Sequence, residues 1–355
     1  MQKFFHLTLL LCYLGAVSQT KNAVDTTSAV RTKNIDFNVM PYLNYSRTLE
    51  FMFGAIPMMM YKIDKTDTIS PKCLSGVSAV YTTNKSYFIA AFNRLYFKED
   101  TWRAQILALT GQHNAEFYMD DLETSDFYDY GTKTTLISAV VQRKIVKALY
   151  GGLGYTYAHY NTNYEDDVQP SSISHTNGVQ LNMMYDTRDA VYYPTQGSKI
   201  KLKWISYPMW LGNDADADKI NSEYNKYFPI RKGSDVLAVR FSGKFGLGDI
   251  AFEQQLTIGG KDIRGYSEGK YRGDGLMALQ GEYRYNFNKK MGLVGFAGLA
   301  TIYGSDTSSF NWGLYPGAGV GYRYRAFKNE KFNIGLDGAV GKGDWGIYFR
   351  IGEAF

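Results

Sequence analysis

The sequence predicts an all-β fold: a 16-stranded antiparallel transmembrane β-barrel with one long loop between its eleventh and twelfth strands. Three observations predict it. Segment after segment alternates apolar and polar side chains with the period of two that is typical of a strand, and no long helical pattern interrupts them. The chain has 30 Tyr, 21 Phe and 36 Gly but only 8 Pro, a composition rich in β-formers. No run of the mature chain reaches the length of a membrane-spanning helix, which leaves a closed barrel as the membrane fold.

The N-terminal segment predicts export. Lys3 provides a short basic head, an apolar stretch follows it, and Ala16-Val17-Ser18 has the small residues of a cleavage site. The next residues, 19–33, are polar and aperiodic and predict a short tail. The expected organisation is therefore a signal peptide at 1–18, a tail at 19–33 and a transmembrane barrel at 34–355.

The strands are expected in unbroken succession after the tail. The alternation is clearest near the end of the chain, where Leu279 and Tyr283 fall on one face and Glu282 and Arg284 on the other. Most long connections fall on one side and most short turns on the other, the asymmetry of outer-membrane barrels. The predicted strands are 36–46, 49–61, 75–83, 87–96, 101–118, 132–145, 148–161, 176–186, 196–208, 220–230, 235–248, 274–287, 291–304, 312–327, 331–341 and 346–355.

Charge and motif content argue against several function classes. The formal net charge of +5 comes without a basic run, so no nucleic-acid partner is predicted. No Gly-x-Ser-x-Gly, zinc spacing or phosphate loop occurs, and the adjacent Ser174 and His175 would point to opposite faces of a strand. We therefore predict no enzyme, no catalytic residue and no cofactor. Only Cys73 remains after cleavage, so no internal disulfide is expected.

One acidic loop has the opening spacing of a calcium site. Asp214, Asp216 and Asp218 alternate as in an EF-hand, but Lys219 stands where the loop needs Gly and Asn225 where it needs Glu. A solvated acidic loop is the default interpretation, and weak divalent binding stays open. No metal site is predicted.

Three motifs carry a resemblance to a known family. They are Arg264-Gly265-Tyr266 in a long Gly-rich connection, Asp186-Thr187-Arg188-Asp189 followed by Tyr193-Pro194-Thr195-Gln196-Gly197, and the aromatic terminal residue Phe355. Together they resemble the BamA/TamA superfamily of outer-membrane assembly and translocation proteins, also called the bacterial surface antigen family. The resemblance covers residues 34–355 and implies a location in the bacterial outer membrane, among its lipids.

The resemblance implies that the connection carrying Arg264 folds back into the lumen. A guanidinium there must stay hydrogen-bonded, and Glu282, on the inward face of the next strand, is placed to accept from it. Gly265 allows a sharp turn, and Tyr266 is expected to pack between loop and wall. The alternative is that Arg264 is an ordinary surface-loop cation.

The family's second lumenal carboxylate is missing from its usual place in a Phe-x-Asp-x-Gly pattern, which here reads Phe296-Ala297-Gly298-Leu299-Ala300. Asp337 is a candidate substitute. For the turn motif we expect a structural role, a charged turn that closes a long strand pair; its candidate residues are Asp186, Arg188, Asp189, Pro194 and Gly197. Phe355 would be the sorting signal that the host barrel-assembly machinery reads.

Two functions are left open. The first is an insertase or translocase whose seam, between first and last strands, opens sideways to template incoming strands. Family members with that activity carry periplasmic POTRA modules, and this chain predicts a POTRA-less member that needs a periplasmic or outer-membrane partner protein. The second is a passive pore or a structural barrel subunit of an envelope complex.

Overall fold

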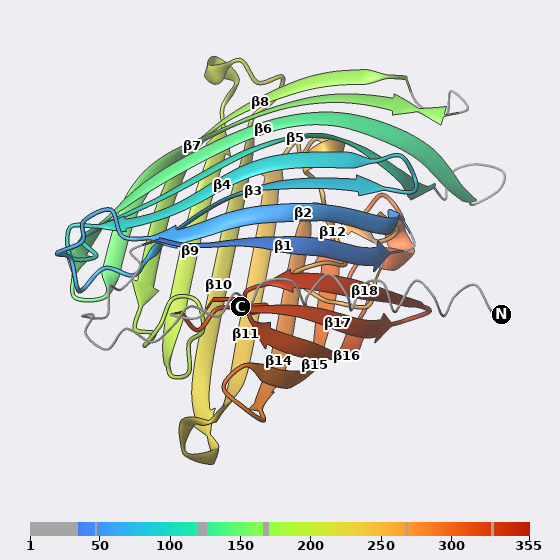
Figure 1. Cartoon of the computed structure of the whole chain (residues 1–355). Helices are drawn as coiled ribbons and strands as arrows, with labels where there is room; N and C mark the ends of the chain where they lie inside the picture. The colour runs from blue at the N-terminus through green and yellow to red at the C-terminus, as the bar shows by residue number, and fades with distance from the viewer. Residues whose placement is uncertain (1–34, 47, 120–125, 166–169, 267–268, 328–329) are drawn as a thin grey trace, which may run out of the picture. The chain divides into compact units, whose positions relative to one another are not determined.

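Figure 1 shows a computed structural model of the chain, in which the strands form a barrel. The structure describes residues 35–355 except 47, 120–125, 166–169, 267–268 and 328–329. The predicted signal peptide, 1–18, and the predicted tail, 19–33, lie outside the described residues.

Antiparallel strands close into one barrel, so the predicted fold is confirmed. Each barrel strand pairs with its neighbour in sequence, β11 pairs with β14 across the long loop, and β1 meets β18. The sixteen barrel strands of the described residues are Ile35–Ser46 (β1), Glu50–Tyr61 (β2), Cys73–Thr82 (β3), Tyr87–Phe97 (β4), Trp102–Met119 (β5), Asp126–Val146 (β6), Leu149–Tyr164 (β7), Ser172–Asp186 (β8), Gly197–Tyr207 (β9), Ala217–Ile230 (β10), Asp235–Gly248 (β11), Gly275–Asn286 (β14), Met291–Tyr303 (β15), Tyr315–Arg325 (β16), Asn333–Gly341 (β17) and Asp344–Ile351 (β18).

Many strand boundaries differ from the sequence prediction by a few residues, and three differences have a structural reason. Strand β6 begins at Asp126 instead of 132, because backbone pairing with β5 continues past Asp129 and Gly131, which interrupt the apolar alternation. The last strand ends at Ile351 instead of 355. The long loop contains a small sheet of its own, Leu256–Thr257 (β12) with Arg272–Gly273 (β13), which no apolar pattern signalled.

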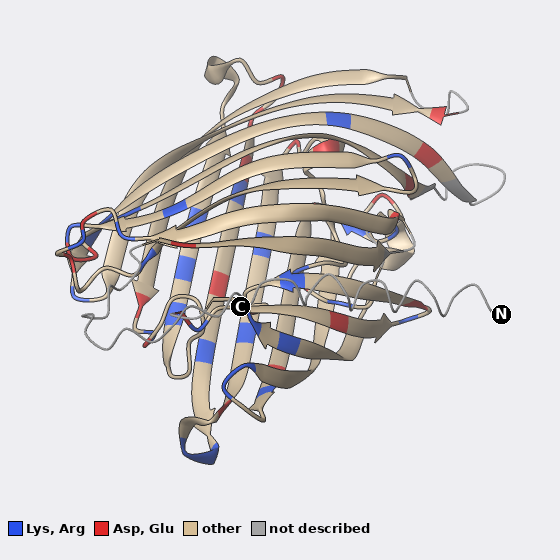
Figure 2. Cartoon of the chain, in the orientation of Figure 1, with Lys and Arg blue, Asp and Glu red and all other residues tan. Residues whose placement is uncertain are grey.

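The two faces of the wall differ as the alternation predicts. Leu279 and Val320 are 54% and 70% exposed on the outside, whereas Gln280 and Arg284 are buried on the inside. Exposed apolar side chains outside and polar ones inside are the arrangement of a barrel wall in contact with lipid. Figure 2 shows the charged residues of β9 to β11 as bands along the strands.

No helix in the described ranges is long and apolar enough to cross a membrane.

The lumen is filled on one side by the long loop, residues 249–274. Its apolar side chains pack against the inner faces of β14, β15 and β16 in a buried cluster. This packing holds the loop inside the barrel. The members of the cluster are Ile258, Ile263, Tyr266, Tyr271, Leu276, Ala278, Ala300, Ile302 and Tyr315.

The connections define two ends of the barrel. We call the end that carries 62–72, 98–101, 147–148, 187–196, 231–234, 287–290 and 326–332 the turn end, and the opposite end, from which the long loop folds inward, the loop end.

Candidate functional site: the lumenal arginine loop and the seam

Arg264 points into the barrel wall and is 1% exposed. It donates from Nη1 to Oδ2 of Asp337 at 2.6 Å and from Nη2 to Oε2 of Glu282 at 3.0 Å. Its guanidinium carbon lies 3.3 Å from the centre of the Phe296 ring. The guanidinium is thus held by two carboxylates and an aromatic face, which excludes the alternative of a surface-loop cation.

The second carboxylate comes from a different strand than the family pattern uses. Asp337 lies on β17 and is fully buried. Gly298 on β15 stands where the pattern has Asp. A Cβ there would lie 2.6 Å from the carbonyl oxygen of Leu279 and 2.9 Å from the side chains of Gln280 and Ile263. The wall and the loop therefore leave no room for a side chain at this position, and Asp337 supplies the charge.

Arginines from three other strands complete the network. Arg284 donates to Glu282 at 2.9 Å, and Arg350 donates to Asp337 at 3.1 Å. Arg323 also donates to Asp337 and reaches Glu353 at 3.0 Å. The inward faces of these strands were predicted from alternation, but which charges meet was not.

Gly265 is required by its contact with the wall. Its φ is +105°, and an added Cβ would lie 2.4 Å from the carbonyl carbon of Val340. Both the backbone conformation and the close approach exclude a side chain. From the sequence we expected Gly265 only to allow a sharp turn. The close contact with Val340 is a further reason why this position needs glycine.

Tyr266 lies between loop and wall, as we expected. Its hydroxyl donates to the carbonyl of Pro316 at 2.6 Å and accepts from the backbone N–H of Lys342 at 3.0 Å. The hydroxyl of Tyr348 accepts from the N–H of Gly265 and donates to the carbonyl of Tyr266, at 2.9 and 3.1 Å. The tripeptide is thereby tied to β16, β17 and β18.

The turn motif forms its own network at the turn end. Arg188 binds both carboxylate oxygens of Asp186 at 2.8 and 2.9 Å, and Arg103 of β5 adds a bond of 2.7 Å. Burial lowers the pKa of Arg188, but the hydrogen-bonded Asp186 carboxylate raises it by more, so the pKa of Arg188 lies above its usual value. Asp189 accepts from the backbone N–H of Thr195 at 2.8 Å.

The two remaining motif residues also lie in this turn. Gly197 has φ +92°, and an added Cβ would lie 2.2 Å from the carbonyl oxygen of Thr187. Pro194 lines a lumenal cavity. These contacts give the turn motif the geometry of a folded turn.

The seam between β1 and β18 has very little backbone pairing. In the described residues these strands share one register pair, Tyr45↔Ile347, whereas β1 and β2 share twelve. Side chains fill the rest: Tyr42 contacts Phe349 edge-on with ring centres 5.4 Å apart, and Tyr45 stacks on Trp345 at 5.1 Å. A wall closed by side chains is weaker than one closed by a hydrogen-bond ladder.

Nearer the turn end, side chains bridge the seam. Asn38 of β1 donates to the carbonyl of Ala326 at 2.8 Å. Lys72 lies between Asp36 and Glu330, at 2.8 and 3.3 Å. Burial lowers the pKa of Lys72, but the two carboxylates raise it by more, so the pKa of Lys72 lies above its usual value.

A family comparison decides the identity of this fold. A model of the Omp85 superfamily domain matches residues 75–355. The chain belongs to the Omp85 superfamily. The resemblance drawn from the three motifs is confirmed, and the protein is a bacterial outer-membrane barrel. Because outer-membrane barrels have short periplasmic turns and longer external loops, we assign the turn end to the periplasm. Omp85 barrels are transporters and insertases and not enzymes.

Solved structures of other Omp85-like barrels share the fold. BamA from Haemophilus ducreyi lacking POTRA domains 1–3 has 13% identity and a TM-score of 0.58, with 96% of this chain and 77% of that chain covered. CdiB from Acinetobacter baumannii has 13% identity and a TM-score of 0.61, with 89% of this chain and 59% of that chain covered. CdiB from Escherichia coli has 10% identity and a TM-score of 0.61, with 90% of this chain and 68% of that chain covered. This chain thus spans about three fifths of the first CdiB. No curated protein matches the chain.

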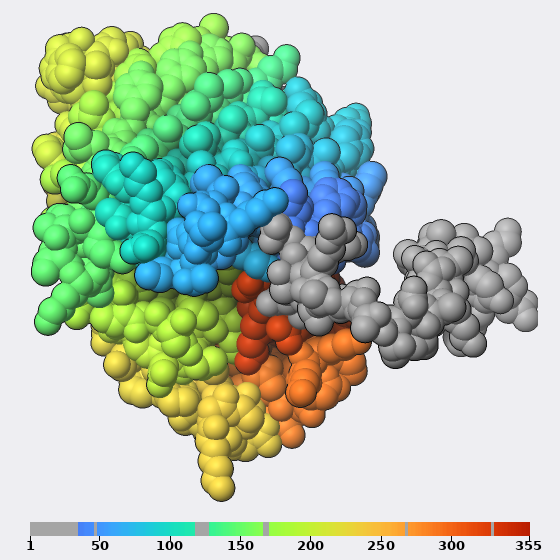
Figure 3. All heavy atoms as spheres, turned by 60° about the vertical axis from the view of Figure 1, so that its left-hand side comes forward, coloured from blue at the N-terminus to red at the C-terminus, as the bar shows by residue number. Residues whose placement is uncertain are grey.

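The C-terminus of this Omp85 barrel turns into the periplasmic mouth. Arg284 donates to the carbonyl of Phe355 at 2.7 Å, and the Phe355 ring packs beside Tyr193 and Tyr227. Figure 3 shows the red C-terminal segment set between the yellow-green and orange segments. The expectation that Phe355 continues the last strand was therefore wrong, because the chain leaves the wall after Ile351.

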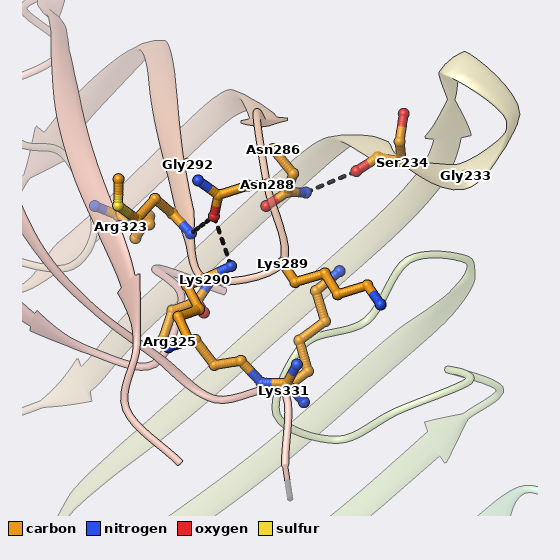
Figure 4. Close-up of a pocket in the computed structure, with 12 residues that line it drawn as sticks. Gly233, Ser234, Asn286, Asn288, Lys289, Lys290, Gly292, Arg323, Arg325 and Lys331 are labelled. Atoms are coloured by element: carbon orange, nitrogen blue, oxygen red, sulfur yellow. Dashed lines mark hydrogen bonds between the residues drawn. The ribbon is translucent and has the colours of Figure 1, made fainter. Parts of the chain in front are cut away.

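The mouth of the Omp85 barrel also holds a basic pocket of about 370 Å³ (Figure 4). Lys289, Lys290, Arg325 and Lys331 line it, and no carboxylate does. Burial and the neighbouring Arg325 lower the pKa of Lys331. Sequence analysis missed this pocket because each turn contributes only one or two cations.

Proposed function

We propose that this Omp85 barrel inserts or translocates proteins at the outer membrane by opening the seam between β1 and β18. The observation that carries the proposal is the single register pair of that seam. Each backbone hydrogen bond contributes roughly 0.5–1.5 kcal/mol, and β1 pairs with β2 at twelve positions. Opening the β1–β18 seam therefore costs far less than opening the adjacent hairpin.

An open seam would expose the free edge of β1. An incoming strand could pair with that edge through backbone hydrogen bonds, which is β-augmentation. The outer face of β1 is apolar, with Ile35, Phe37 and Val39 at least half exposed, so lipids of the outer membrane would cover it. A strand templated there would already lie at membrane depth.

The proposal includes two partners. Within residues 35–355 the described chain consists of barrel strands and their connections, so a periplasmic or outer-membrane partner protein would supply the reception that POTRA modules give. The host assembly machinery would read Phe355 as a sorting signal during the barrel's own insertion. Because Phe355 packs inside the finished barrel, that reading would precede closure.

A disulfide lock tests the proposal. Tyr45 faces Ile347 across the seam and Phe51 across the β1–β2 hairpin, and directly opposed strand residues are within disulfide reach. Tyr45→Cys with Ile347→Cys locks the seam, and Tyr45→Cys with Phe51→Cys is a matched control that leaves it free. The native complex, isolated in mild detergent and reconstituted, is given a urea-unfolded outer-membrane barrel.

We expect wild type and control to accelerate folding of that substrate, and the oxidised seam lock to lose the acceleration until dithiothreitol restores it. An oxidised lock that works as well as the control would refute seam opening. A wild-type complex without acceleration would refute the insertase and favour the pore or structural subunit.

A further inference from the structure

The lumen also has a hollow half, which the loop bounds on one side at Lys261. Three cavities of about 470, 470 and 260 Å³ lie there, and Phe92 lines all of them. One reaches Arg188 and Pro194 in the periplasmic turn, and another reaches Leu49 in the hairpin at the loop end. The three cavities share Phe92 as a lining residue, and their linings together reach from the turn end to the loop end of the barrel.

The walls of this hollow half carry a large excess of positive charge. Seven basic and two acidic side chains line the three cavities. Both acids are already bound: Glu223 accepts from Lys199 at 3.0 Å, and Glu353 accepts from Arg323 at 3.0 Å. The basic residues are Arg94, Arg188, Lys199, Lys201, Lys203, Lys261 and Arg350.

Four of these cations have no counter-charge in contact. In the part of the chain that the structure describes, the side chains of Arg94, Lys201, Lys203 and Lys261 make no hydrogen bond or ion pair. Cations inside a low-dielectric wall focus the field and raise the local concentration of anions. The hollow half therefore favours anionic over cationic solutes.

The smallest cavity combines such cations with an unsatisfied donor. Arg94 of β4 and Lys201 and Lys203 of β9 line it, and no carboxylate does. Asn182 of β8 faces Lys203 in register and is 2% exposed, and its Nδ2 has no hydrogen-bond partner within the described chain. Charged donors and a free amide N–H form a set complementary to a small oxyanion or halide.

The periplasmic mouth extends the same field. The pocket in Figure 4 presents Lys289, Lys290, Arg325 and Lys331 without a lining carboxylate. Its residues come from the turns at this end and the strand ends beside them, so solutes of the periplasm can reach it. An anion would meet a positive potential before it enters the lumen.

We propose that the hollow half of the lumen is a pathway for small anions, with Arg94, Lys201, Lys203 and Asn182 as its binding site. Its ligands are halide, carboxylate and phosphate groups small enough for a cavity of about 260 Å³. The pathway needs neither seam opening nor a protein substrate, so it stands apart from the insertase proposal.

Planar-bilayer recording of the whole barrel in a KCl gradient tests it. The reversal potential of the wild type is expected to have the sign of an anion-selective pore. Lys201→Glu with Lys203→Glu should move that potential through zero, and Lys201→Gln with Lys203→Gln should move it part of the way. The charge-matched control is Lys133→Glu with Lys226→Glu, two lysines on outward positions of β6 and β10, which should leave selectivity unchanged.

A second measurement separates binding of an anion at the site from a general effect of the positive charges on the current. Phosphate added to the KCl solution should lower chloride current in the wild type and lower it less in Asn182→Leu. A silent or cation-selective wild type would overturn the proposal, as would an equal shift in the control. If the Glu variant does not fold, the Gln variant decides: an unchanged reversal potential there also overturns it.

Discussion

Removing the guanidinium of Arg264 should lower the free energy of unfolding of the barrel by about 3 kcal/mol. Breaking a buried ion pair from one side costs about 3–5 kcal/mol. We use the lower end of this range because both carboxylates keep other ion-pair partners in the variant. Glu282 still pairs with Arg284, and Asp337 still pairs with Arg323 and Arg350. Loss of the stacking on Phe296, worth about 2 kcal/mol when desolvated, argues against a smaller value.

The assay is equilibrium urea unfolding of the barrel in detergent micelles, followed by tryptophan fluorescence. Arg264→Ala is compared with Arg264→Lys, which keeps the charge without the planar fork and should recover only part of the loss. The control is Arg231→Ala. Its side chain is 46% exposed, and its buried partner Asp235 keeps hydrogen bonds from the Tyr283 hydroxyl and the Asn286 N–H, so its loss of unfolding free energy should be smaller than that of Arg264→Ala.

Release of the loop gives an independent measurement. If Arg264 holds the loop inward, trypsin should cut the Arg264→Ala variant within residues 249–274 while leaving the Arg231→Ala variant intact there. Equal losses of unfolding free energy in the two variants, together with an uncut loop, would refute the role assigned to Arg264.

Three further predictions follow from the same contacts. Gly265→Ala should cost more unfolding free energy in urea than Gly343→Ala, because both have positive φ (+105° and +71°) but only Gly265 abuts backbone; equal costs would contradict the close approach. Tyr348→Phe should cost about 1–3 kcal/mol in the same assay by leaving two buried backbone groups without a partner, and a neutral result would contradict that hydrogen-bond pattern. Phe92→Ala should raise single-channel conductance in bilayers, since Phe92 lines all three cavities, and an unchanged conductance would exclude it as the narrow point.

Strand order and the orientation of side chains followed from local pattern. Alternation assigned Glu282 and Arg284 inward and Leu279 and Tyr283 outward, and the structure agrees. Strand ends were less predictable where a charged residue and a glycine interrupt the alternation, as at Asp129 and Gly131 in β6. Neither the small sheet of β12 and β13 nor the inward C-terminus has an apolar period, since tertiary contacts with the lumen hold both.

The candidate site was predicted in part. The Arg264 motif and its inward acceptor Glu282 could be named, because one lies in the loop and the other on a predicted inward face. Asp337 could only be suggested as a candidate. Whether its carboxylate reaches the guanidinium depends on where the loop lies beside β17, which Gly265 abuts at Val340, and no local sequence pattern gives that position.

The sequence by itself determined that this chain builds a β-barrel with an apolar exterior and a charged interior, because alternation with period two is a local property of a strand. Only the tertiary structure decided which charges neutralise one another, that β1 and β18 meet at one register pair, and that Arg94, Lys201 and Lys203 share a cavity. Those outcomes depend on barrel closure and on the loop's packing, which bring together residues that are distant in the chain.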